Sequence, residues 1–80
     1  MHYVYVLQSE SDAKLYIGYT NDLKKRLRIH QEGKVQSTKR RLPLMLVYYE
    51  ACLSKTNARD RERFLKTGWG RNYLKKRLAQ

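Results

Sequence analysis

The sequence is poor in cysteine, proline and glycine, and it has no long apolar run. Among 80 residues there are one cysteine, one proline and four glycines. The single cysteine, Cys52, can neither form an internal disulfide nor build a thiolate metal site. The longest apolar run, Leu44–Tyr49, has six residues, whereas a membrane-spanning helix needs about 20. No charged head followed by an apolar segment opens the chain, so we expect no signal peptide and a reduced, cytoplasmic setting.

Acidic residues are also scarce, and this is the strongest signal in the composition. Seven Asp and Glu face 18 Lys and Arg, which gives a net charge of +11. A surface of this charge attracts polyanions, and nucleic acid is the commonest polyanion in a cell. A solvated basic surface or a ribosome-associated protein is the alternative. If DNA binds, we expect phosphate contacts from basic residues of the first helix, the central loop and the terminal helix: Lys24, Lys25, Lys39, Arg40, Arg41, Arg71, Lys75 and Lys76.

The pattern of apolar residues divides the chain into short strands and helices. Eighty residues are enough for one small domain, residues 1–80. A period of two residues predicts a strand, and a spacing of three and four residues predicts a helix. The expected strands are Tyr3–Leu7, Leu15–Thr20 and residues 44–50, and the expected helices are residues 20–33, 54–68 and 70–80. The order ββαβαα indicates an α+β fold.

Polar residues and glycines mark the ends of the expected helices. Thr20 or Asn21 is suited to cap the first helix, and Gly33 is placed to end it. The second helix is expected to begin at residues 54–56 and to end at Gly68. The loop between the first helix and the third strand is polar and basic, and no regular structure is expected there.

The first two strands predict a hairpin that carries tyrosines on one face. Folding the hairpin about residues 10 and 11 sets Tyr5 nearly opposite Tyr16, and directly opposed residues point to the same side of a sheet. Tyrosine packs well in strands, so ordinary sheet packing and a role in a reaction are both open for these two phenols. Packing is the interpretation for the other tyrosines considered, which are Tyr19, Tyr48, Tyr49 and Tyr73.

The first helix brings a basic and a titratable side chain to the margin of its apolar stripe. Leu23 and Leu27 form the stripe, and Arg26 and His30 lie one turn apart beside it. A solvated arginine and a hydrogen-bonded histidine at the core margin are the plain interpretations of Arg26 and His30.

The second helix has a carboxylate on its otherwise small and apolar face. Ala58, Glu62 and Leu65 fall on one side of a helix. A glutamate is rarely buried unless a cation holds it. That cation is either a metal ion or a neighbouring side chain, and an ion pair with Lys66 or Arg59 at the helix edge is the simpler alternative.

Four short segments together resemble the GIY-YIG endonucleases. They are YVY at 3–5, YIG at 16–18, TNDLKKRLRIH at 20–30 and ARDRERFLK at 58–66. The resemblance covers nearly the whole chain and is closest to small stand-alone members, similar to the amino-terminal nuclease domain of the excinuclease C subunit. It implies a three-stranded antiparallel sheet flanked by helices. It also implies cleavage of DNA phosphodiesters with one divalent metal, Mg²⁺ or another such as Mn²⁺.

The resemblance also implies which residues form the site. Tyr5 and Tyr16 match the two motif tyrosines, Arg26 matches the arginine of the first helix, and Glu62 matches the metal-binding glutamate. His30 matches a position that is tyrosine or histidine among relatives. The implied function is a metal-dependent DNA endonuclease of repair or recombination, working alone or in a larger repair assembly. A non-catalytic nucleic-acid-binding module on the same fold is the alternative.

The sequence departs from the family pattern in three places. The first motif, residues 3–5, lacks its leading glycine, and Asn57 precedes Ala58 where small relatives often have glutamate. Tyr19 stands where excinuclease relatives carry a lysine thought to tune the neighbouring tyrosine, so how the base is activated stays open. Which of the two motif tyrosines acts as the base stays open as well. Asn72 is the only candidate for an asparagine that joins the site in some members.

Overall fold

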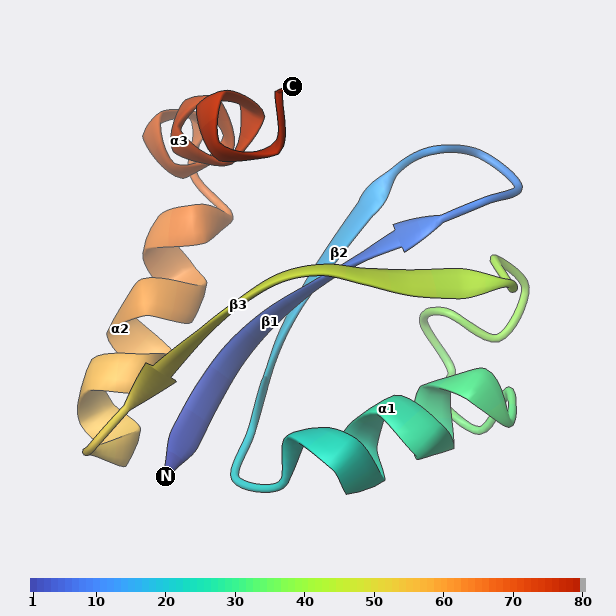
Figure 1. The fold of residues 1–80 in the computed structure, drawn as a ribbon, viewed down its shortest axis with the longest axis horizontal. Helices are drawn as coiled ribbons and strands as arrows, with labels where there is room; N and C mark the ends of the chain where they lie inside the picture. The colour runs from blue at the N-terminus through green and yellow to red at the C-terminus, as the bar shows by residue number, and fades with distance from the viewer. Residues whose placement is uncertain (80) are drawn as a thin grey trace.

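A three-stranded antiparallel sheet lies between helices that cover both of its faces (Figure 1). The computed structural model describes residues 1–79. The strands are β1 (His2–Ser9), β2 (Leu15–Thr20) and β3 (Leu44–Cys52), and the helices are α1 (Leu23–Gln31), α2 (Lys55–Leu65) and α3 (Gly68–Leu78). The central strand is β1, in the order β2-β1-β3. The predicted α+β fold and the order ββαβαα are confirmed.

Alternation along β1 builds one apolar core on each face of the sheet. Val4 and Val6 are fully buried and pack with Leu65 of α2. Tyr5 and Leu7 point to the other face, where the leucines of α1 pack against them. Fully burying an aliphatic side chain stabilises a fold by about 1.5–3 kcal/mol. The two cores therefore fix which residues of β1 face α1 and which face α2.

The β1–β2 hairpin has a register two residues away from the predicted one. Tyr5 is opposite Gly18, and Tyr16 is opposite Leu7. The predicted pairing of Tyr5 with Tyr16 is therefore wrong. Because a shift of two residues preserves the alternation of side chains, both phenols still lie on the α1 face.

Side chains at the start of α1 set its position beneath the sheet. The N-cap is Asp22, whose carboxylate accepts the Lys25 backbone N–H over 3.1 Å. The predicted cap at Thr20 or Asn21 is wrong. Thr20 instead uses its hydroxyl to accept the Asp22 N–H over 3.1 Å, which shapes the turn before the helix. Gly33, with φ of +74°, follows the end of α1 as predicted.

The boundary between α2 and α3 differs from the predicted one. Thr67 caps α3 by accepting the Gly70 N–H over 3.1 Å, so Gly68 begins α3 instead of ending α2. The two helices meet closely at Gly70, where an added Cβ would lie 2.0 Å from the Phe64 carbonyl oxygen. None of the helices within residues 1–79 has the length and apolar character needed to cross a bilayer.

Candidate active site

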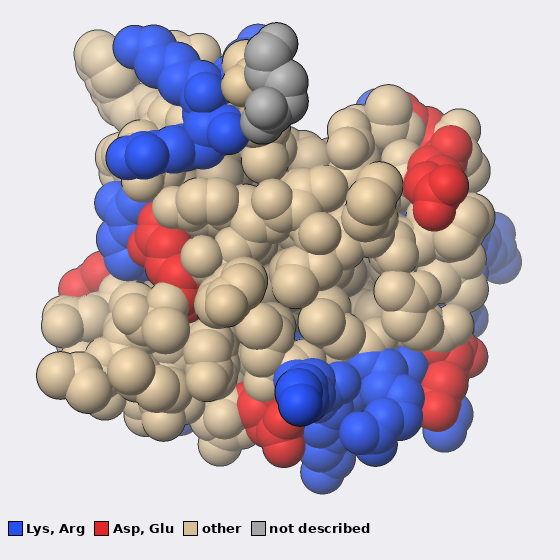
Figure 2. Space-filling view, viewed as in Figure 1, with Lys and Arg blue, Asp and Glu red and all other residues tan. Residues whose placement is uncertain are grey.

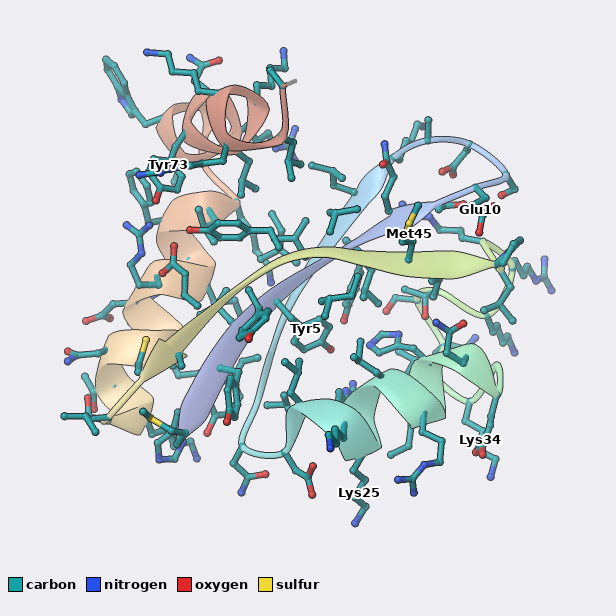
Figure 3. The ribbon with its side chains drawn as sticks, in the orientation of Figure 1. Tyr5, Glu10, Lys25, Lys34, Met45 and Tyr73 are labelled. Atoms are coloured by element: carbon teal, nitrogen blue, oxygen red, sulfur yellow. The ribbon has the colours of Figure 1, made fainter. Side chains whose placement is uncertain are left out.

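Tyr5, at the middle of the central strand, is the largest fully buried side chain within residues 1–79. Its neighbour across the hairpin is Gly18. A Cβ added at Gly18 would lie 2.5 Å from both Cζ and Oη of the Tyr5 phenol. The glycine thus leaves the space that the phenol fills, and Figure 3 shows Tyr5 between the sheet and α1.

A chain of hydrogen bonds connects Tyr5 to α1 and then to the loop that follows α1. Arg26 Nε donates to Tyr5 Oη over 3.3 Å. Tyr5 Oη lies 2.8 Å from His30 Nε2, and His30 Nδ1 lies 2.8 Å from Thr38 Oγ1. A guanidinium can only donate, so the Tyr5 oxygen accepts from Arg26. We assign the proton of the Tyr5 hydroxyl to the bond with His30 Nε2, because this gives the buried hydroxyl an acceptor. In this assignment His30 carries its own proton on Nδ1 and donates it to Thr38.

Tyr16 stands beside this chain on the edge strand β2. Its ring centroid lies 5.3 Å from that of His30 and 6.4 Å from that of Tyr5. Tyr5 and His30 are fully buried, whereas Tyr16 is only partly buried. Next to His30, the α1 face of the sheet therefore carries one buried phenol, Tyr5, and one that solvent reaches, Tyr16.

Burial and neighbouring charges shift the pKa values of Tyr5, His30 and Arg26 in different directions. Burial raises the pKa of Tyr5 above 10.0, although the hydrogen bond from Arg26 acts in the opposite sense. Burial, followed by the charge of Arg26, lowers the pKa of His30 from 6.5 to about 4. The hydrogen bond to Tyr5 raises the pKa of Arg26. At neutral pH Tyr5 keeps its proton, His30 is neutral and Arg26 is charged.

Glu62 belongs to α2, which packs on the sheet face opposite to α1. Its side chain is 14% exposed, and its carboxylate pairs with Arg59 Nε at 3.5 Å and Lys66 Nζ at 3.1 Å. Within residues 1–79 no hydrogen bond joins Glu62 to the Tyr5 chain, although its charge makes a minor contribution to the raised pKa of Tyr5. The same part of the protein contains no group of three or more His, Cys, Asp or Glu side chains that could hold a metal ion. The ion pairs of the simpler interpretation are present, and the role of Glu62 as a metal ligand stays a prediction.

The basic residues predicted to contact phosphate lie on separate parts of the surface. In Figure 2, Lys and Arg side chains gather near α1 and near α3, with a largely uncharged band between them. Arg41 is partly buried, and its Nε lies 3.4 Å from Asp12 Oδ2, which ties the central loop to the hairpin turn. The other predicted contacts are exposed and are Lys24, Lys25, Lys39, Arg40, Arg71, Lys75 and Lys76.

Thr38 and Gly18 belong to this site, although the sequence did not indicate their roles. Thr38 is fully buried and holds the second nitrogen of His30. It lies in a polar loop with no periodic pattern, so no signal in the sequence distinguishes it from its neighbours. Gly18 belongs to the YIG segment at 16–18. That it leaves room for the Tyr5 phenol depends on the register of the hairpin, which the segment alone does not indicate. Asn72 is exposed on α3, and within residues 1–79 no hydrogen bond joins it to the Tyr5 chain.

The same architecture occurs in a solved structure. The solution NMR structure of a UPF0213 protein from Bacillus halodurans matches with a TM-score of 0.57 and 36% sequence identity. The match covers 91% of this chain and 80% of that one.

The sequences of further UPF0213 proteins are also similar to this chain. A UPF0213 protein of Bacillus pumilus is 46% identical over 71 residues, which are 88% of this chain and 70% of that protein. A UPF0213 protein of Streptococcus pyogenes is 49% identical over 65 residues, which are 80% of this chain and 70% of that protein. Residues 1–79 match the family described as the GIY-YIG catalytic domain. The chain therefore belongs to the GIY-YIG catalytic domain family.

Proposed function

We propose that this protein is a metal-dependent endonuclease that hydrolyses DNA phosphodiester bonds in repair or recombination. The observation that carries the proposal is the hydrogen-bonded chain that runs from the partly buried Arg26 through the buried Tyr5 to the buried His30, beside Tyr16. Burying polar groups is costly unless they are hydrogen-bonded, and sets of this kind are more typical of functional sites than of cores. A non-catalytic nucleic-acid-binding module needs the basic surface but does not need these hydrogen bonds among Arg26, Tyr5 and His30. Membership of a family of catalytic domains supports the enzyme.

Arg26 is the residue we assign to the phosphate. Its Nε is already engaged by Tyr5, which leaves the two terminal nitrogens for non-bridging phosphate oxygens. A planar guanidinium is suited to such a clamp. Because Tyr5 fixes Arg26 before substrate binds, the positive charge needs little reorganisation when negative charge develops on the phosphate.

The two phenols have different parts in this proposal. A general base works best when its pKa is near the working pH, and burial moves the pKa of Tyr5 away from that range. We therefore assign Tyr5 to positioning Arg26 and His30. Tyr16, which is partly exposed, is assigned to contact the attacking water and to orient it in line with the leaving oxygen.

A divalent cation, Mg²⁺ or Mn²⁺, is the proposed cofactor, and Glu62 would hold it. Mg²⁺ is often bound by one or two carboxylates, with water and substrate phosphates as its other ligands, so a single partly exposed carboxylate fits. The partners of Glu62, Arg59 and Lys66, have side chains that are 51% and 52% exposed. Exposed helix pairs contribute only about 0.3–0.5 kcal/mol, so they compete weakly with a metal. When bound, the cation would supply stabilisation of negative charge on the phosphate and the leaving oxygen.

The test is the cleavage of labelled linear, flap and four-way DNA by wild type and Glu62→Gln, with and without Mg²⁺. Glutamine keeps the shape of the side chain and removes the charge that attracts a hard cation. We expect cleavage to fall by at least about 100-fold, while DNA binding and the melting temperature are retained. Tyr16→Phe is expected to lower cleavage by about 100-fold as well.

Asp60→Asn is the matched control for Glu62→Gln. Asp60 lies on the same helix and pairs with Arg63 at the exposed surface, so its substitution should change cleavage by less than about two-fold. Undiminished cleavage by Glu62→Gln would contradict the metal assignment. Binding of DNA by wild type with no cleavage in Mg²⁺ or Mn²⁺ would favour the non-catalytic alternative.

A further inference from the structure

Trp69 is the single tryptophan of the chain, and its side chain is 81% exposed. It lies near the start of α3, a helix that packs inward through Gly70 and Leu74. Tyr73, labelled in Figure 3, turns inward and shares a 3.2 Å hydrogen bond with Tyr48. Within residues 1–79 no aromatic ring or guanidinium stacks on Trp69, whereas Arg61 and Arg77 both lie over Tyr73. One exposed apolar residue needs no explanation by itself. Whether Trp69 belongs to a binding surface therefore depends on the residues around it.

Shallow hollows run along α3 and connect Trp69 with the β1–β2 hairpin. The first lies between the hairpin and the helix and includes Lys14, Arg71 and Lys75. The second includes Arg71 and Lys75 again and adds Trp69 and Asn72. The third continues from Trp69 to Lys76. Because neighbouring hollows share residues, they form one continuous surface, here called the α3 strip and defined as Lys14, Trp69, Arg71, Asn72, Lys75 and Lys76.

The α3 strip is positively charged and has no acidic member. No Asp or Glu lines any of its three hollows. Five of the seven acidic residues form ion pairs within residues 1–79, and none of those pairs involves a cation of the strip. In Figure 2, the Lys and Arg side chains of α3 stand out at the upper left of the molecule. The strip therefore offers cations without a paired carboxylate in both of the hollows that the exposed Trp69 lines.

We infer that the α3 strip binds single-stranded DNA, with a base stacked on Trp69 and phosphates held by Arg71, Lys75 and Lys76. Aromatic platforms interleaved with cations bind single strands because every unpaired base has a free face for stacking. Bases inside a duplex are already stacked and have no such face. A second copy of this chain is a poor occupant, since both surfaces would be cationic and each chain carries a charge of +11.

This inference deepens the proposed endonuclease and rests on it for its biological meaning. It assigns a substrate class, a duplex that carries an unpaired strand, such as a flap, a tail or a fork. The unpaired strand would lie along α3 and the duplex would contact the α1 face. The strip then contributes affinity for the branched form of the substrate and takes no part in bond cleavage.

The test uses Trp69 itself as the reporter, because no other tryptophan contributes fluorescence. The full chain is titrated with an oligodeoxythymidylate of about 12 nucleotides, without metal. We expect saturable quenching of the tryptophan emission, as a stacked base gives. An oligomer of the same length built from abasic nucleotides keeps the phosphates, and we expect it to bind about ten-fold more weakly and to quench little.

Variants separate stacking from charge. Trp69→Ala should lower the affinity for the oligomer by about ten-fold, and Trp69→Phe should restore most of that loss. Leu53→Ala is the matched control, since Leu53 is an apolar side chain that is 88% exposed and lies outside the strip. Both positions are exposed, so the melting temperature should not change. Equal affinity of Trp69→Ala and wild type for the single strand would overturn the inference.

The affinity ratio of a tailed duplex to a blunt duplex distinguishes this inference from the proposed function. Trp69→Ala should lower the ratio by about ten-fold, and Leu53→Ala should leave it unchanged. Quenching by the oligomer without cleavage of any DNA in either Mg²⁺ or Mn²⁺ would refute the endonuclease and support the strip. Cleavage of DNA by wild type, together with an affinity ratio that is unchanged in Trp69→Ala, would support the endonuclease and refute the strip. Quenching by phosphatidylserine vesicles or by an acidic peptide, with none by the oligomer, would also overturn the strip.

Discussion

At the scale of the residue, Gly18 determines whether the Tyr5 phenol can occupy its site. We predict that Gly18→Ala destabilises the protein by about 1–3 kcal/mol, because the new methyl group overpacks a filled space. The methyl carbon would lie 2.5 Å from the Tyr5 phenol, so the ring must move away from Arg26 and His30. Cleavage should fall by at least about ten-fold, since Tyr5 no longer positions Arg26. Urea unfolding and a cleavage time course measure both effects.

Gly68→Ala is the control for the stability part of this prediction. A Cβ at Gly68 meets nothing within 4 Å, and alanine favours a helix over glycine by up to about 1 kcal/mol. The control should therefore unfold no earlier than wild type. If Gly18→Ala is as stable and as active as Gly68→Ala, then the close contact with Tyr5 has no consequence.

The sequence predicted the face on which the motif tyrosines lie but not what stands opposite each of them. Alternation in β1 and β2 placed Tyr5 and Tyr16 on one side, and this is confirmed. The register depends on the turn, which closes with a Ser9 N–H bond to the Lys14 carbonyl and a positive φ at Ala13. No residue in that turn is a glycine, asparagine or proline that would have indicated its geometry.

At the scale of the element, a buried histidine joins α1 to the central loop and makes that junction sensitive to pH. His30 has a pKa of about 4 in the fold against 6.5 in an unfolded chain. Between those two values the unfolded chain binds more protons, so acid favours unfolding. We predict that the free energy of unfolding falls as the pH is lowered from about 6.5 to about 4, by up to about 3 kcal/mol. The contribution is fully present above pH 6.5.

Urea unfolding at a series of pH values measures this effect in wild type and in two variants. His30→Gln removes the titrating group, so its free energy of unfolding should change less across the window than that of wild type. His2→Gln is the control, because His30 is still present and the wild-type dependence should be kept. If the free energy of unfolding falls equally with pH in wild type and His30→Gln, then protonation of His30 does not destabilise the fold in acid.

Local residue preferences predicted the elements well, and tertiary contacts decided the rest. Ser54 begins α2 as predicted, since a serine cap needs only its own helix. The break between α2 and α3 depends on the close approach at Gly70, which is a contact between helices. The burial of Thr38 depends on His30, eight residues earlier in the chain. Neither contact has a period or a motif that could be recognised in the sequence.

At the scale of the whole molecule, acidic residues are used to hold the fold together and basic residues are left for a partner. Glu50 pairs with Arg61 across two hydrogen bonds of 2.8 Å and joins β3 to α2. Asp12 pairs with Arg41 and joins the hairpin to the central loop. Because 18 Lys and Arg face only seven Asp and Glu, the surface keeps a positive charge that attracts a polyanion over a long range.

We predict that DNA binding without metal weakens steeply with salt. Each phosphate that the protein neutralises adds about −0.9 to the slope of log affinity against log salt concentration for duplex DNA. Lys25→Gln, on the exposed side of α1, should therefore make the slope shallower by about one unit. Fluorescence anisotropy of a labelled duplex at several salt concentrations measures the slope.

Lys34→Gln is the matched control for this last prediction. Lys34 Nζ lies 3.1 Å from Glu32 Oε1, so its charge is already partly neutralised by the protein and is expected to release fewer counterions on binding. It should change the slope by clearly less than Lys25→Gln does, although both variants lose the same formal charge. An affinity that stays flat from low to physiological salt would contradict nucleic-acid binding altogether. Equal effects of the two lysines would mean that DNA responds to the net charge of the molecule and not to phosphate contacts on α1.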